Sequence, residues 1–147
     1  DFLLVDMPPG TSDAPLTVMQ VLSMDGFVVV TTPQSLAALD AKRSINMIKK
    51  LNVEVLGVVE NLSGVIFGTG AGEQLATDMN LAFLGHLALR PDYRDDTQPT
   101  VLASADVGAE YDTIWAGVRS RLTELQAMPE QIAAAPKTEE GSAETAK

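Results

Sequence analysis

Two residues near the start of the chain have the chemistry and the spacing of a metal and phosphate site. Asp6 directly follows the apolar residues 2–5, and Gly10 comes after Pro8 and Pro9. The apolar run has the length and residue types of a strand that is buried on both faces. At the carboxyl end of such a strand, Asp6 can hold Mg²⁺ through water and the amide of Gly10 can approach a terminal phosphate.

A plainer interpretation of the same residues stays open. Asp6 can cap the helix that follows, and the two prolines can form an ordinary turn. Two adjacent prolines between an acid and a glycine are more than an ordinary turn needs. We therefore favour a functional loop.

The composition limits the partners of the chain. The 147 residues suit one domain, and 46% of them are apolar, which is enough for a core. The formal net charge of −10 argues against a nucleic-acid surface, because such a surface needs clustered Lys and Arg. The same charge argues against an anionic membrane surface. We expect neither nucleic acid nor a membrane as a partner.

The chain contains no Cys, so no disulfide and no Cys-ligated metal site can form within it. No apolar run reaches the roughly 18 residues of a membrane span, and no signal peptide is recognisable. We expect a cytoplasmic protein. Because the chain starts at Asp1 and directly on a predicted buried strand, we interpret it as part of a longer protein.

Strand and helix patterns alternate along most of the chain. The predicted strands are residues 2–5, 27–31, 53–59 and 81–87, and the predicted helices are residues 12–24, 35–51, 71–79 and 108–128. This alternation predicts an α/β fold of three layers around a mainly parallel, doubly wound sheet.

The remaining segments are predicted to be loops or a tail. Residues 64–72 are rich in glycine but lack the Gly-Lys-Ser/Thr of a phosphate-binding loop. Residues 92–107 are polar and acidic, which indicates a solvated surface loop. We assign residues 1–128 to the folded domain and residues 129–147 to a disordered acidic tail.

Three polar side chains have an ordinary structural interpretation as well as a functional one. Asp40 can pair with a neighbouring Lys or Arg on its helix. Asn61 can bond local backbone at the end of a strand, or its amide can read the edge of a base. His86 is the only His and has no partner at metal-site spacing, so we interpret it as structural.

Several blocks together resemble one protein family. The block Asp6-Met7-Pro8-Pro9-Gly10-Thr11 is similar to the Walker B and switch II segment of the Mrp/ApbC-type P-loop ATPases, the iron–sulfur cluster carrier family related to MinD and ParA. Residues 28–34, 38–40, 57–63, 67–73 and 83–85 are similar to further blocks, in the family's order. The resemblance covers about residues 1–125, and it implies the C-terminal half of a P-loop NTPase-like fold.

The resemblance also implies the cofactors and the roles of single residues. It implies ATP and Mg²⁺, with Asp6 holding the metal through water and Gly10 sensing the γ-phosphate. It places Asn61 at the adenine edge, and Pro91 and Asp92 in a loop that wraps the base. It further implies a homodimer, with the helix face that carries Asp40 toward the second subunit, and iron–sulfur client proteins as possible partners.

The sequence departs from the family in two ways. No Gly-rich Walker A loop with its lysine is present, and the family pattern places that loop before Asp1. The chain alone should therefore not hydrolyse ATP. Many members also carry a Cys-x-x-Cys pair where this chain has Gly64-Val65-Ile66, so we predict no iron–sulfur ligand here.

Three functions remain open at this point. The first is the nucleotide-switch half of an Mrp-like ATPase in iron–sulfur cluster assembly or transfer. The second is a MinD/ParA-like positioning ATPase without a cluster role. The third is a non-enzymatic α/β interaction module.

Overall fold

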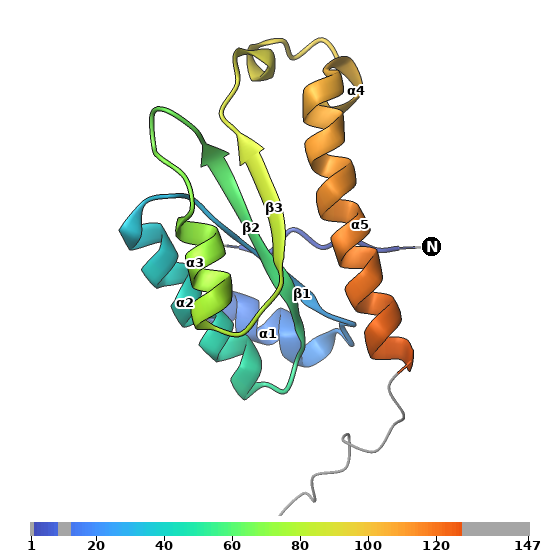
Figure 1. Cartoon of the computed structure of the whole chain (residues 1–147). Helices are drawn as coiled ribbons and strands as arrows, with labels where there is room; N and C mark the ends of the chain where they lie inside the picture. The colour runs from blue at the N-terminus through green and yellow to red at the C-terminus, as the bar shows by residue number, and fades with distance from the viewer. Residues whose placement is uncertain (1, 9–12, 128–147) are drawn as a thin grey trace, which may run out of the picture.

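The computed structural model describes residues 2–8 and 13–127 and arranges their helices and strands in three layers (Figure 1). In chain order, the elements are α1 (Asp13–Val21), β1 (Phe27–Thr31), α2 (Ser35–Lys50), β2 (Val55–Ser63), α3 (Ala71–Asp78), β3 (Phe83–Ala88), the 3₁₀ helix η1 (Pro91–Arg94), α4 (Thr100–Ala103) and α5 (Ala105–Ala127).

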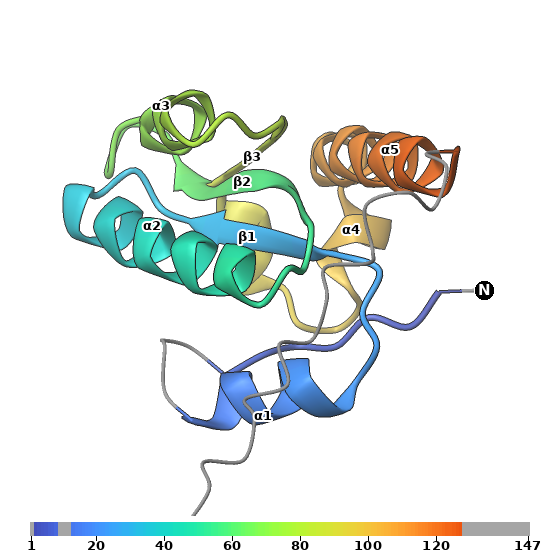
Figure 2. The ribbon, with the colours of Figure 1, turned by 90° about the horizontal axis from the view of Figure 1, so that it is seen from below.

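The sheet contains three parallel strands in the order β1-β2-β3. The views from the front and from below show α2 and α3 on one face and α5 on the other (Figures 1 and 2). The carboxyl ends of the strands lie at the top of Figure 1, where the chain turns into α2, α3 and η1. The predicted parallel, three-layer α/β architecture is confirmed.

Aliphatic side chains fill the space on both faces of the sheet. On the α2 and α3 side, Ile45 and Val58 are fully buried. On the α5 side, Leu84 and Leu87 pack with Val118. The buried residues of both cores are aliphatic, and the aromatic residues Phe27, Phe83 and Trp115 pack against them while only partly buried.

The strand predicted for residues 2–5 is wrong for this structure. These residues form no ladder, and Leu3 and Leu4 are more than four-fifths exposed. The segment passes beyond the outer edge of β1, beside α1, and Phe2 meets Trp115 edge-to-face with ring centroids 4.8 Å apart (Figure 2). A strand needs a hydrogen-bonded neighbour, and the described chain supplies none for this segment.

Several predicted boundaries also differ. β2 begins at Val55 and continues through Ser63, so Glu60 and Asn61 lie inside the strand instead of after it. The first helix ends at Val21. Residues 92–107, predicted as a loop, contain most of η1, all of α4 and the start of α5. The predicted tail, residues 129–147, lies outside the described residues.

Gly57 of β2 packs tightly against the chain at the start of β3. A Cβ atom at Gly57 would lie 2.6 Å from the carbonyl oxygen of Ala82 and 2.6 Å from Cγ of Leu84. The backbone oxygen cannot move without disturbing the Val58–Ala82 hydrogen bond that joins the two strands.

We expect Gly57→Ala to lower the free energy of unfolding by about 2 kcal/mol through overpacking. Gly117→Ala is the matched control, because its Cβ would also meet Leu84, but only the movable Cδ2 atom at 3.0 Å. In the control, helix propensity offsets the contact, and the change should stay within about 1 kcal/mol. Urea unfolding measures the free energy of unfolding of both variants. An equal loss for Gly57→Ala and Gly117→Ala would contradict the backbone clash at Gly57.

Candidate nucleotide site

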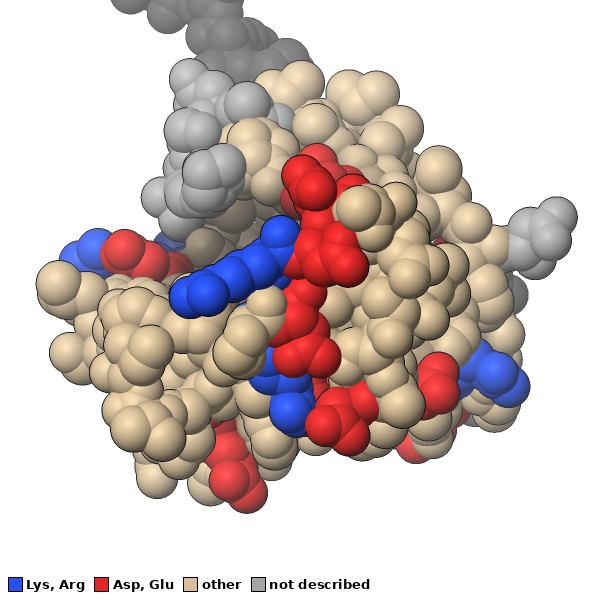
Figure 3. All heavy atoms as spheres, turned by 90° about the horizontal axis from the view of Figure 1, so that it is seen from above, with Lys and Arg blue, Asp and Glu red and all other residues tan. Residues whose placement is uncertain are grey.

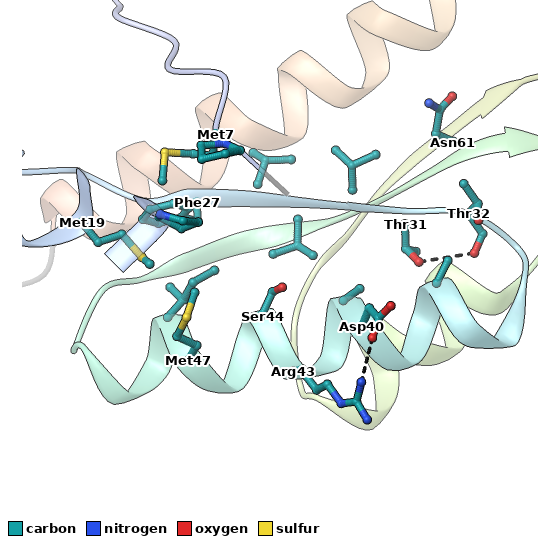
Figure 4. A pocket seen from close by; sticks show the side chains of 18 residues that line it. Met7, Met19, Phe27, Thr31, Thr32, Asp40, Arg43, Ser44, Met47 and Asn61 are labelled. Atoms are coloured by element: carbon teal, nitrogen blue, oxygen red, sulfur yellow. Dashed lines mark hydrogen bonds and ion pairs between the residues drawn. The ribbon is translucent and has the colours of Figure 1, made fainter. Parts of the chain in front are cut away.

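A cavity of about 700 Å³ runs along the outer edge of β1 (Figure 4). Its walls come from β1, from α2, from the segment around Met7 and from Met19 of α1. Asn61 of β2 closes it at one end. A volume of this size is within the range of small-molecule and cofactor sites.

The two ends of the cavity differ in chemistry. Thr31, Thr32 and Asn61 lie at the carboxyl end of β1, whereas Phe27, Met19 and Met47 lie at the other end (Figure 4). Val28 and Val30 of β1 are 37% and 58% exposed. The polar groups at the carboxyl end thus lie at the sheet edge where parallel α/β folds bind ligands, and apolar groups follow along β1.

Asn61 is half-buried, and its side chain bonds the backbone beside it. Its Oδ1 accepts a hydrogen bond from the Leu62 amide at 2.8 Å, and this bond stabilises Leu62 at a φ of +60°. Among the described residues, the amide nitrogen of Asn61 has no hydrogen-bond partner. The local contact is thus observed, and a donor and one oxygen lone pair remain for a ligand.

Asp6 is exposed and lies in the irregular segment, outside the cavity lining. Its neighbour Met7 lies over Phe27, at the opposite end of β1 from Asn61 (Figure 4). The described chain therefore does not bring Asp6 and Asn61 together. Gly10, the predicted phosphate-sensing glycine, lies outside the described residues.

Two of the remaining predicted residues lie elsewhere on the surface, and one lines the cavity. Pro91 and Asp92 are exposed in η1 and do not line the cavity. A hydrogen bond from the Ser104 hydroxyl lowers the pKa of Asp92. Asp40 pairs with Arg43 at 2.9 Å on α2, as its structural interpretation predicts, and both residues line the cavity (Figure 4).

Glu60 is a functional candidate that the sequence analysis did not identify. This residue is 1% exposed, and its carboxylate accepts hydrogen bonds from the Ser63 hydroxyl at 2.7 Å, the Gly70 amide at 2.9 Å and the Gly72 amide at 2.7 Å. Burial raises the pKa of Glu60, but these donors outweigh it, so the pKa lies below its usual value. The signal in the sequence was Gly72: its missing Cβ leaves room for Glu60.

This carboxylate fixes the loop between β2 and α3, which the sequence predicts as a glycine-rich loop. Within the loop, Gly64 and Gly68 exchange two backbone hydrogen bonds of 2.9 and 2.7 Å. The intervening side chains Val65 and Ile66 are highly exposed. The loop is therefore a tight turn that is held at its base.

Metal binding requires more than the described side chains. Within residues 2–8 and 13–127, no three His, Asp or Glu side chains gather in a group that could hold an ion. Mg²⁺ commonly takes one or two carboxylates and completes its shell with water and substrate phosphates. A lone Asp6 thus suits Mg²⁺ only together with a bound phosphate.

The family model described as ParA, the NUBPL iron-transfer P-loop NTPase, matches residues 1–119. The chain belongs to this family. Its α/β sheet, its Asp-Met-Pro-Pro-Gly-Thr block and the Asn at the carboxyl rim all lie in the matched region.

Curated relatives of this P-loop NTPase agree with the match. The chain is 39% identical over 128 residues to the iron-sulfur cluster carrier protein of Methanocaldococcus jannaschii, a match that covers 78% of this chain and 44% of the relative. It is 40% identical over 135 residues to the protein of that name from Escherichia coli K12, covering 83% and 36%. The chain thus spans less than half the length of these relatives.

A solved structure gives the same result for the fold. The nucleotide-binding protein of Archaeoglobus fulgidus, in complex with ADP, matches with a TM-score of 0.51 and 27% identity. The match covers 89% of this chain and 49% of that protein. Separately, the described helices include none that is long and apolar enough to cross a membrane.

We expect Glu60→Gln to lower the free energy of unfolding by about 2 kcal/mol, because a neutral amide accepts fewer and weaker bonds from the three donors. Since folding lowers the pKa of Glu60, its stabilisation is present above the unfolded pKa and is lost as the pH falls through the folded pKa. The difference in the free energy of unfolding between wild type and Glu60→Gln should therefore become smaller at acidic pH.

The control is Glu73→Gln. It removes an exposed acid from the first turn of α3, the helix whose start is bonded by Glu60. Urea unfolding between neutral and acidic pH measures both variants. A gap that stays constant over this range, or a control that behaves like Glu60→Gln, would contradict the role of the buried carboxylate.

Proposed function

We propose that this chain is the nucleotide-switch half of an ATP-binding and ATP-hydrolysing protein that takes part in iron–sulfur cluster assembly or transfer. The observation that carries the proposal is the family match over residues 1–119 together with the cavity that ends at Asn61. The names of the relatives support the cluster role, and the ADP complex of the solved neighbour supports the nucleotide.

The shape and chemistry of the cavity support a site that further residues complete. The polar end beside Thr31, Thr32 and Asn61 suits the base of a nucleotide. The apolar remainder, with the exposed Val28 and Val30 at an unpaired strand edge, suits a further strand. We propose that residues of a longer polypeptide add this strand and carry the phosphate-binding lysine that the P-loop family requires.

Each predicted residue then has a role in the completed site. Asp6 holds Mg²⁺ through water, Gly10 donates its N–H to the γ-phosphate, and Asn61 bonds the adenine edge. Pro91 and Asp92 contact the base from η1. When bound, Mg²⁺ neutralises charge on the phosphates, and catalysis rests on positioning and charge stabilisation. Two such subunits form a homodimer, and iron–sulfur proteins are the clients.

We expect Asp6→Ala in the full-length gene product to lower ATP turnover on the order of 100-fold, the scale of losing one group that stabilises transition-state charge. Asp25→Ala removes an exposed acid outside the cavity and serves as the control. Steady-state phosphate release measures both. Equal rates for Asp6→Ala and wild type would remove Asp6 from the mechanism, and a full-length protein without turnover would overturn the ATPase function.

The absence of Cys favours a second candidate, a positioning ATPase of the MinD/ParA type without a cluster role. Anaerobic reconstitution of this chain with iron and sulfide tests whether the chain itself can hold a cluster. We expect no visible chromophore, since the chain has no thiolate to hold a cluster. A chromophore bound in equimolar amount would contradict that expectation and would strengthen the carrier function.

A further inference from the structure

The segment after β3 carries two residues of the proposed base site, yet its own packing does not fix it. It leaves the top of the sheet, passes through η1 and α4, and reaches α5 (Figure 1). Residues 91–99 are all exposed. An exposed stretch of this length is ordered only if other contacts hold it, because each ordered residue loses conformational entropy.

Glu110 of α5 provides such a contact at the start of the segment. Its side chain is 13% exposed, and its carboxylate accepts a hydrogen bond from Nη2 of Arg90 at 2.5 Å and one from the Ala88 amide at 3.2 Å. Arg90 is itself mostly covered, with 30% of its side chain exposed, and Nη1 lies 3.5 Å from Asp106. One carboxylate thus holds the end of β3 and the residue that precedes Pro91.

The Ser104 hydroxyl stabilises the charged form of Asp92 and lowers its pKa, so Asp92 also interacts with the end of the segment. Seen from above, acidic side chains form a band across this end of the molecule with basic side chains beside them (Figure 3). Among these acids, Arg90 is bonded by Glu110 and attracted by Asp106 and Asp92 as well, which raises the pKa of Arg90.

The pair is not needed to hold α5 on the sheet. Val118, Leu84 and Leu87 bury that contact in the core on the α5 side, with Trp115 and Ile114 packed against it. Loss of the ion pair should therefore leave the helix in place and release only the segment between β3 and α4.

We propose that Arg90 and Glu110 are positioning residues for the nucleotide: they hold Pro91 and Asp92 as a preformed wall, so that the base binds without the entropic cost of ordering the segment. The inference rests on the proposed function for its nucleotide part. A preformed wall raises affinity because less conformational freedom is lost on binding. The Arg90–Glu110 pair should affect binding of the base only. In the proposed site, the phosphates lie toward Asp6 and toward the P-loop of the longer polypeptide.

The test compares two Arg–Glu pairs that involve α5. Arg90→Gln, Glu110→Gln and the double variant remove the charges, while the glutamine amide introduced by Glu110→Gln can still accept from the Ala88 N–H. Arg121→Gln and Glu124→Gln form the matched control, because Arg121 and Glu124 also lie 2.5 Å apart but within one helix. Hydrogen exchange on the 147-residue chain reports the amides of residues 89–104.

We expect Arg90→Gln and Glu110→Gln each to raise the rate of amide hydrogen exchange in residues 89–104. The double variant should raise this rate no further, and the control variants should leave it unchanged. In the full-length gene product, ATP affinity should fall about tenfold, the scale of one charged hydrogen bond. Affinity for tripolyphosphate, which lacks a base, should stay unchanged.

The outcomes that overturn the inference are distinct from those that overturn the proposed function. Unchanged exchange would show that the pair does not hold the segment. Raised exchange with unchanged ATP affinity, or an equal loss for ATP and tripolyphosphate, would refute the preformed base wall. Failure of the wild-type full-length protein to bind ATP would refute the proposed function and the nucleotide part, while the exchange result would still decide the role of the pair.

Discussion

The structure depends on one constraint: a strand forms only where its backbone groups find hydrogen-bonded neighbours. β2 has neighbours on both sides and is the best-buried strand, with residues 55–60 all buried. β1 is paired on one side only, and the apolar residues 2–5 are not paired at all. The cavity along β1 and the exposure of Leu3 and Leu4 follow directly from this unmet pairing.

The same constraint explains why Asn61 is fixed in position and Asp6 is not. Asn61 is held because β2 is paired on both sides and because the Leu62 amide bonds its side chain. Asp6 lacks such support, since residues 2–5 form no strand with the rest of the described chain. A carboxylate on an unpaired segment cannot be held at the fixed distance from a phosphate that metal-assisted chemistry requires.

Two acids, the buried Glu60 and the half-buried Glu110, act in the same manner. Each accepts hydrogen bonds from the backbone and from a side chain, and each ties a segment at the carboxyl edge of the sheet to a neighbouring element. Glu60 secures the loop between β2 and α3, and Glu110 secures the segment after β3. These two acids thus fix the arrangement of the segments at the carboxyl edge of the sheet.

Local sequence determined the class of the fold, the helices α2, α3 and α5, and the strands β1 and β3 within a few residues. Apolar periodicity and turn residues act over short distances, so a single chain reveals them. Tertiary structure alone decided that residues 2–5 do not form a strand, that β2 runs on through the charged Glu60, and that Asp6 lies apart from Asn61. Strand pairing and the desolvation of a carboxylate both depend on partners far away in the chain, and no local pattern carries that information.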